Sequence, residues 1–292
     1  MEFAYGPLVM ELAQRLMKAG VQLPRASQGS RTARPSAAYK RALLAASMER
    51  FGPRFIERLG REVASDHRGH PFLSALVATR TPEQLLIRWQ RLEVLAHSEN
   101  RVKLLAVDGE GVRLLRARAS GGAPTFEEDT LVVGILAGLL EALGARNVRV
   151  RQETAGGLAD GRGWALRWRE WTRPPRPRPV EPWGSSSDFA RAAFTLLLED
   201  TGLPLSTLAR RLGVSRRTLQ RRLLDGGTSF RALVRTARVA LVGASLHEHA
   251  ASASLTSVAH ACGFADSAHL SREFRSLVGV QPSRFAQALQ AV

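Results

Sequence analysis

The sequence predicts an α+β N-terminal domain, made of helices and a small antiparallel sheet, followed by an all-α C-terminal domain. Three features of the 292-residue chain predict this. One turn-containing pattern occurs at residues 205–224 and again at 255–274, the hydrophobic period changes from helical to alternating near Arg101, and prolines cluster between residues 171 and 187. We therefore expect domains at residues 1–170 and 188–292, joined by a linker at 171–187.

Composition supports two folded domains and bounds the class of protein. Hydrophobic residues make up 45% of the chain and the net charge is +16, which favours polyanionic partners. The excess charge is spread along the chain, so charge alone does not locate a binding site. Cys262 is the only cysteine, which excludes an intramolecular disulfide and fits a reducing cytoplasm. The most apolar run, Leu131 to Leu140, is too short to span a membrane.

The first hundred residues show helical periodicity. Helices are expected at residues 3–19, 39–49 and 55–64, with loops at 25–36 and 65–69. A fourth helix begins at His70-Pro71 and runs through Val77. Thr81-Pro82-Glu83 is a strong helix start, with threonine as N-cap and proline in the first position, and predicts a helix carrying Leu85 to Leu95.

The next segment alternates in polarity and predicts strands. Residues 101–107 and 112–119 flank the sequence DGEG, which is typical of a hairpin. The DGEG loop lacks the length and ligand spacing of a calcium loop. An apolar helix is expected at residues 126–143, where Gly134, Ala137 and Gly138 predict burial on several sides or packing against a second copy. Residues 148–152 and 164–168 can add strands to the hairpin.

Residues 171–187 read as a linker. Five prolines between residues 174 and 182 stiffen the segment as an extended spacer. A proline-rich ligand for a partner domain is the alternative, and the linker is favoured. Asp188 is then expected to cap a helix over Phe189 to Glu199.

The stretch LSTLARRLGVSRRTLQRRLL at residues 205–224 has the layout of a helix-turn-helix. Apolar residues at helical spacing precede Gly213, which can take the positive φ of a turn, and Ser215 is a good N-cap. Leu219 and Leu223 pack inward on the second helix. The remaining residues point outward, and their side chains can pair with guanine, adenine or phosphate: Arg216, Arg217, Gln220, Arg221 and Arg222. Such a face is often merely solvated, but a second copy strengthens the DNA hypothesis.

That second copy is LTSVAHACGFADSAHLSREF at residues 255–274. Gly263 matches Gly213, and Asp266 takes the capping place of Ser215 after one extra residue. Two recognition helices held about one turn of DNA apart can enter successive major grooves without a dimer.

Residues ~186–292 resemble the DNA-binding domain of the AraC/XylS family of bacterial transcription regulators. The matching pieces are GVSRRTLQRRL, GTSFRALVRTARVALV and CGFADSAHLSREFRSLVGVQPSRF. The resemblance implies seven helices, with a linker helix from Phe230 to about His247 and a last helix starting at Pro282. Leu233, Ala237, Ala240, Leu241 and Ala244 form the apolar side of that linker helix. The resemblance implies base contacts from Arg217, Gln220, Arg221, Ala268, Ser271 and Arg272, and phosphate contacts from Arg275 and Arg284. Ala268 offers only a methyl-sized contact, so a weak or shape-based readout is expected from the second motif.

Residues ~70–170 are similar to the arabinose-binding-like effector domain found in one branch of the same family. This resemblance implies a small-molecule effector, a homodimer, or both, and RNA polymerase as a partner if the protein activates genes. It fixes neither the effector nor the pocket residues, and no cofactor is implied.

Enzyme chemistry finds no support in the sequence. There is no phosphate-binding loop, dinucleotide fingerprint or paired-cysteine spacing. Related repeats can be fused to a DNA alkyl-repair enzyme, but that reaction needs reactive cysteines and only Cys262 is present, which reads as a buried apolar residue. His260 reads as core or near-core and His269 as a surface or phosphate-adjacent group. The pair His247 and His249 has poor spacing for a metal. No metal site is expected.

The prediction is therefore a cytoplasmic, sequence-specific regulator that binds the major groove of double-stranded DNA. One alternative is a DNA-organising protein with little sequence preference. The other is a ligand carrier or enzyme in residues 1–170 that the C-terminal domain tethers to DNA.

Overall fold

The computed structural model describes residues 37–65, 71–97, 99–153, 161–172, 188–226, 228–248 and 254–290, with scattered positions between Val9 and Gly20. The expected loop at 25–36, most of the break at 65–69, His249 and the linker from residue 173 to 187 lie outside them. Contacts divide the chain into two compact units. Among described residues, the N-terminal unit takes those up to Ser65 and from Leu76 to Thr172, and the C-terminal unit takes Pro71–Ala75 and those from Asp188 onward.

The helices of the first half begin where the sequence predicts them, within a few residues. Thr81 caps its helix by accepting a hydrogen bond from the backbone N–H of Gln84 at 3.2 Å. Gly52, at φ 74°, separates the second and third helices. The bounds are α2 Ala37–Phe51, α3 Pro53–Ser65, α4 Pro71–Val77, α5 Pro82–Ala96 and α6 Phe126–Leu143. The helical positions between Val9 and Met17 include the buried Leu12 and Leu16.

The sheet of the N-terminal unit is antiparallel, with order β1-β2-β5-β4. The hairpin is confirmed, with Asp108 opposite Gly111 across a two-residue turn. Strand β5 starts two residues before the expected position, and Trp168 falls after its end. The strands are β1 Asn100–Asp108, β2 Gly111–Arg118, β4 Arg149–Glu153 and β5 Arg162–Arg167. A two-residue pair, β3 Ala145–Arg146 with β6 Glu170–Trp171, was not predicted because so short a strand has no readable period.

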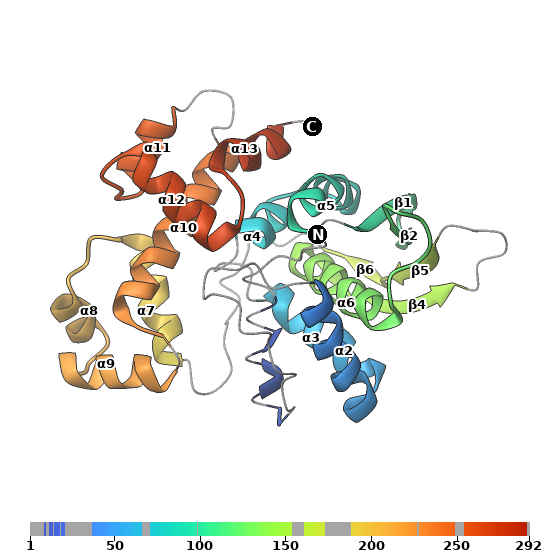
Figure 1. Cartoon of the computed structure of the whole chain (residues 1–292), viewed down its shortest axis with the longest axis horizontal. Helices are drawn as coiled ribbons and strands as arrows, with labels where there is room; N and C mark the ends of the chain where they lie inside the picture. The colour runs from blue at the N-terminus through green and yellow to red at the C-terminus, as the bar shows by residue number, and fades with distance from the viewer. Residues whose placement is uncertain are drawn as a thin grey trace. The chain divides into compact units, whose positions relative to one another are not determined.

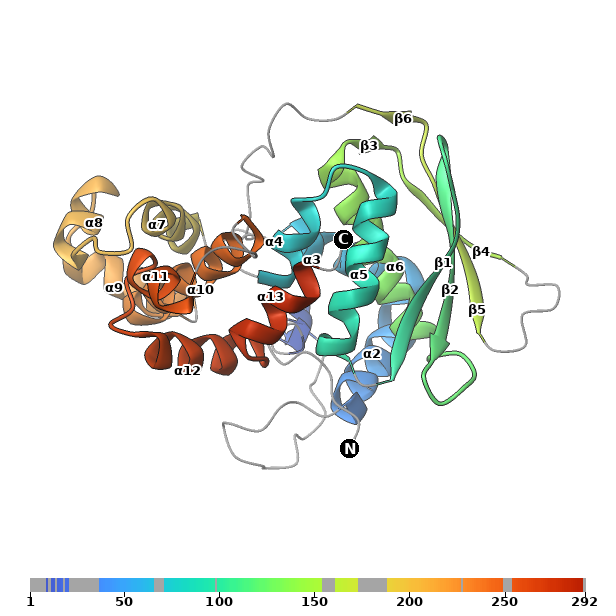
Figure 2. The same ribbon diagram turned by 90° about the horizontal axis from the view of Figure 1, so that it is seen from above.

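Helix α6 is the core of the N-terminal unit and is buried along most of its length within one copy of the chain. It packs against α3 through glycines: a Cβ on Gly134 would lie 2.3 Å from the carbonyl oxygen of Glu57, and one on Gly60 2.5 Å from that of Leu131. Figure 2 shows α5 and α6 on one side of the sheet. The first alternative from the sequence, burial on several sides, is therefore correct and needs no second copy.

A buried ionic network, which the sequence analysis missed, ties this sheet to the helices. Arg116 on β2 is 0% exposed and donates from Nη1 to Glu93 at 2.8 Å and from Nε to Asp129 at 3.2 Å. Burial raises the pKa of Asp129, although Arg116 and Arg162 oppose the shift.

A second buried ion pair joins two helices of the same unit. Lys40 of α2 contacts Glu128 of α6 at 2.7 Å and His97 at 3.0 Å. Burial, together with the Lys40 charge, lowers the pKa of His97 to about 3.

Figure 1 shows that the C-terminal unit is helical. Its described residues from Asp188 onward form seven helices, which is the number implied by the family resemblance. Helix α7 begins at Asp188 itself, and the capping role expected of that side chain lies outside the described side chains. The bounds are α7 Asp188–Glu199, α8 Leu205–Arg211, α9 Arg216–Asp225, α10 Phe230–Glu248, α11 Leu255–Ala261, α12 Ser267–Val278 and α13 Pro282–Gln290. Within the described parts of both units, no helix has the length and apolarity needed to cross a membrane.

Candidate nucleic-acid interface

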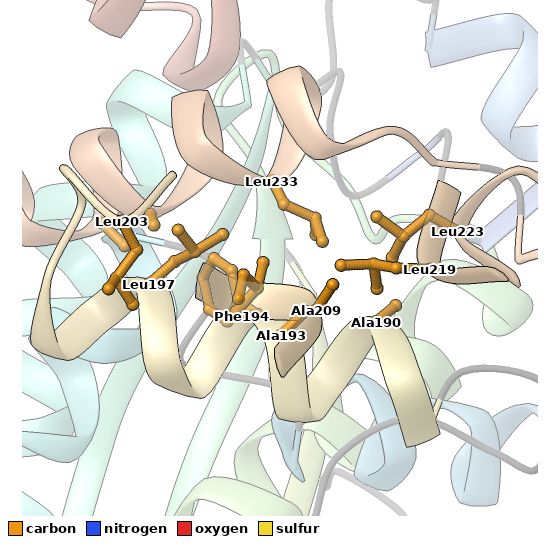
Figure 3. Close-up of a cluster of buried hydrophobic side chains, with 12 residues drawn as sticks. Ala190, Ala193, Phe194, Leu197, Leu203, Ala209, Leu219, Leu223 and Leu233 are labelled. Carbon is orange, nitrogen blue, oxygen red and sulfur yellow. The ribbon is translucent and has the colours of Figure 1, made fainter. Parts of the chain in front are cut away.

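The first helix-turn-helix consists of α8 and α9. Gly213 makes the turn with φ 67°, and the Ser215 hydroxyl accepts from the backbone N–H of Thr218 at 3.1 Å, which starts α9. Leu219 and Leu223 are fully buried. Figure 3 shows their side chains in one apolar cluster with residues of α7 and with Leu233 of α10. This core fixes the orientation of α9.

The opposite side of α9 is exposed. Arg217, Gln220 and Arg221 are exposed and lie at helical spacing on the side away from Leu219 and Leu223. Arg216, in the first turn, is also exposed. The guanidinium of Arg222 lies 4.0 Å from the ring centroid of Phe189, so this arginine covers α7 as well as facing solvent. The face therefore offers donors in the pattern that base edges and phosphates accept.

The second motif repeats this construction with α11 and α12. Gly263 turns the chain at φ 81°, and Asp266 accepts from the backbone N–H of His269 at 2.6 Å. That hydrogen bond lowers the pKa of Asp266, so the cap is a carboxylate at neutral pH. Leu270 and Phe274 are fully buried. The alignment of the two copies made on the sequence therefore holds at the turn, the cap and the core.

The exposed side of α12 carries fewer groups that can read bases. Ala268, Arg272 and Arg275 are exposed, and Ser271 is half-buried. Arg284, which lies on α13, is exposed too. Of the three residues implied as base contacts in this motif, only Arg272 has a long side chain that ends in hydrogen-bond donors.

Helix α10 joins the motifs without a break from Phe230 to Glu248. Leu233, Ala237 and Ala240 are buried as predicted. Ala244 is exposed, which corrects the expected apolar side. The buried side continues instead through Val239, Val242 and Leu246, because a different side of α10 is buried in its last turns.

The residues near the turn of the second motif differ in how far they are exposed. Cys262 is buried, and burial raises the pKa of its thiol to about 11, so it is an unreactive apolar side chain. His260 was expected in or near the core but is exposed, because it lies on the outer side of α11. His269 is half-buried, with its ring 5.3 Å from that of Phe264.

A pocket of about 570 Å³ lies between α10 and the second motif. Its three arginines were not predicted as site residues, although their spacing along α10, at i, i+4 and i+7, was a readable signal. Glu273 is ion-paired with Arg235, which also donates to Ser276 at 2.7 Å. The lining residues are Phe230, Arg231, Val234, Arg235, Arg238, Phe264, His269 and Glu273.

The core of the second motif also includes the start of α4. The ring of Phe72 lies 5.3 Å from that of Phe285, which in turn lies 5.4 Å from Phe274. Pro71 approaches α10 so closely that a Cβ on Gly243 would lie 2.9 Å from it. No periodicity in the sequence signals this contact, because Phe72 is more than a hundred residues from its partners.

Comparison with models of protein families agrees with the two motifs. Residues 208–288 match the model of a family described as a helix-turn-helix domain. No curated protein sequence matches the chain. Among solved structures, ToxT from Vibrio cholerae is 22% identical over 36% of this chain and 39% of that chain, with a TM-score of 0.32.

Two other solved structures have similar sequence identities and TM-scores. A DNA-binding transcriptional dual regulator from Escherichia coli K-12 is 20% identical over 34% of this chain and 89% of that one, with a TM-score of 0.31. The regulator CdpR from Pseudomonas aeruginosa is 16% identical over 98% of this chain and 100% of that one, with a TM-score of 0.33. The match to ToxT spans about two-fifths of the ToxT chain. With two capped motifs and a continuous joining helix, residues 208–288 of this chain form a helix-turn-helix domain.

Proposed function

We propose that the protein is a sequence-specific transcription regulator that reads two adjacent segments of the DNA major groove with α9 and α12. One observation carries the proposal. Both motifs have a complete turn, cap and core, and each presents an exposed helix face while one unbroken helix joins them. A single chain can thus present two recognition helices.

The residues proposed for direct readout are Arg217, Gln220 and Arg221 on α9 and Arg272 on α12. Arginine can pair bidentately with guanine, and glutamine with adenine. Arg216, Arg222, Arg275 and Arg284 are proposed to neutralise phosphates, and Ala268 and Ser271 to make short contacts at the groove. Arg222 has a second role in covering Phe189.

The N-terminal unit is proposed as an effector-sensing or dimerisation domain. This rests on the resemblance of residues 70–170 to an effector domain. Native mass spectrometry of the purified chain tests both roles, because a co-purified small molecule and a dimer each give a distinct mass. A monomer that carries no ligand, and that binds its DNA identically with and without cell extract, would contradict them.

Selection from fragmented genomic DNA at physiological salt tests the regulator. The expected result is a small set of fragments that share two sequence elements about ten base pairs apart. Recovery in proportion to abundance, with and without cell extract, would instead support a DNA-organising protein. A steep salt dependence with little discrimination would be its second signature.

The readout residues are tested by a matched pair of substitutions. Arg221→Ala is expected to weaken binding to the recovered site by roughly 5- to 150-fold, equivalent to about 1–3 kcal/mol, and to relax preference at one base pair. Arg284→Ala is expected to weaken binding to all sequences alike. If Arg221→Ala binds the recovered site as tightly as the unchanged protein, the proposed orientation of α9 is wrong.

A further inference from the structure

The arginines of α10 form a stripe that faces the pocket beside the second motif. Arg231, Arg235 and Arg238 lie at i, i+4 and i+7, so their side chains project from one side of the helix. The stripe spans roughly 10 Å at 1.5 Å per residue. This is a concentration of positive charge on the helix that joins the two motifs.

The pocket has little negative charge to balance that stripe. Glu273 is its one lining carboxylate, and the ion pair with Arg235 occupies it. Within the described part of the chain, no carboxylate pairs with Arg231 or Arg238. The Nε of Arg238 is buried and has no hydrogen-bond partner there. A buried donor without an acceptor costs free energy, so the charge of Arg238 is incompletely balanced by the protein.

The pocket lies next to the exposed face of α12. His269 and Glu273 line the pocket, and each follows directly after a residue of that face, Ala268 and Arg272. The guanidinium of Arg238 also approaches the second turn, because a Cβ on Gly263 would lie 3.1 Å from its Nε. The pocket begins at Phe230, in the first turn of α10, which directly follows the first motif. It therefore lies beside the second motif, along the helix that joins this motif to the first.

We propose that this pocket holds the sugar-phosphate backbone of DNA where it passes between the two major-groove segments, with Arg231 and Arg238 as phosphate contacts. The lining matches that chemistry, since arginines can neutralise phosphates and the apolar side chains Phe230, Val234 and Phe264 can pack against deoxyribose. The proposal rests on the proposed function and adds a third contact region to the two recognition helices. It also gives α10 a direct role in binding.

Salt dependence of binding tests this contact. Two duplexes of equal length are used: one carries the genomic site recovered by selection, and the other has the same composition in scrambled order. Fluorescence anisotropy gives the dissociation constant of each duplex between 50 and 200 mM salt. Each phosphate contact contributes about 0.9 to the slope of log affinity against log salt concentration.

The double variant Arg231→Ala, Arg238→Ala is expected to lower that slope by about two on both duplexes. Arg149→Ala, Arg151→Ala is the matched control for net charge, because both arginines are exposed on β4 of the N-terminal unit and their loss should leave the slope unchanged. Arg231→Lys, Arg238→Lys should restore most of the slope, since lysine also neutralises phosphate. Circular dichroism of each variant checks that α7–α13 still fold.

A second measurement locates the contact. Replacing single phosphates between the two sequence elements with neutral methylphosphonates should weaken binding of the unchanged protein but not weaken the double alanine variant further. An unchanged slope in a folded double variant, or equal sensitivity of both proteins to the neutral phosphates, would overturn the proposal.

These outcomes are separable from failure of the proposed function, which would appear as equal affinity of the unchanged protein for the two duplexes. If selection yields no shared site, the slope on the scrambled duplex still decides the pocket, because phosphate contacts do not depend on sequence.

Discussion

Replacing Arg116 tests whether the buried ionic network holds the N-terminal unit together. Arg116→Met keeps the length and apolar stem of the side chain but removes the charge from a fully buried position between Glu93 and Asp129. Removing one partner of a buried ion pair costs about 3–5 kcal/mol. The lower end is expected here, because Glu93 still accepts from the backbone N–H of Val102 at 2.6 Å and Asp129 from Arg162 at 2.6 Å.

The same strand supplies the control. Arg113 also binds a carboxylate, Glu153, at 2.9 Å, but its side chain is 48% exposed. A surface pair contributes about 0–1 kcal/mol. Arg113→Met should therefore lower the midpoint of thermal unfolding by at most a few degrees, and Arg116→Met by roughly 6–12 °C, at about 2–4 °C per kcal/mol for a unit of this size.

Tryptophan fluorescence follows this unit in the whole chain. Four of the five tryptophans, Trp89, Trp164, Trp168 and Trp171, lie in the N-terminal unit and none lies in α7–α13, so the signal reports mainly the N-terminal unit. Equal midpoints for Arg116→Met and Arg113→Met would refute the reasoning, because the network would then contribute no more than a surface pair. A loss of the fluorescence transition in Arg116→Met alone would mean that the network is needed for folding.

Three further predictions concern single positions. The pKa of His97 is about 3 in the fold against 6.5 in the unfolded chain, so between these values the unfolded state binds more protons and stability falls as the pH drops below 6.5. His97→Gln should flatten this fall between pH 7 and 5, measured by urea titration followed by fluorescence. An unchanged fall would contradict the assignment. Gly134→Ala forces a methyl group toward the backbone of α3 and should cost about 1–3 kcal/mol in the same titration, with the open Gly109→Ala as its control. Gly213→Ala meets no neighbouring atom but keeps a φ of 67°, so it should cost about 1–2 kcal/mol from the backbone alone, measured by circular dichroism of the C-terminal unit; no loss would mean that the turn relaxes.

The C-terminal unit was predictable because its signals are local and occur twice. Each signal acts within a few residues. A glycine makes the turn, a capping side chain accepts from an N–H three residues further on, and buried side chains lie one helical turn apart. Gly213 and Gly263 both have positive φ, and Ser215 and Asp266 both cap, as the sequence pattern requires. The exposed recognition faces followed from the same periodicity.

Long-range partners were not predictable in the same way. Arg116 and Asp129 are thirteen residues apart, and Lys40 and Glu128 are still further apart. Arg116 is one of three arginines in its strand, and nothing local distinguishes it from the exposed Arg113 until the opposing carboxylates are placed. The contact of Phe72 with Phe285 is hidden for the same reason. Periodicity shows which side of an element is buried, but not which other element covers it.

The two motifs share a scaffold but differ in the groups that can identify a base. The turn, the cap and the two buried anchors are equivalent, so both recognition helices are held by the same kinds of contact. On α9, Arg217, Gln220 and Arg221 can each discriminate a base pair, whereas on α12 only Arg272 has that reach. Discrimination costs about 1–3 kcal/mol per wrong pair, so most sequence information should lie in the half-site bound by α9. The half-site under α12 is then expected to be more tolerant of base changes and more sensitive to DNA shape, because its protein side offers short side chains and phosphate contacts.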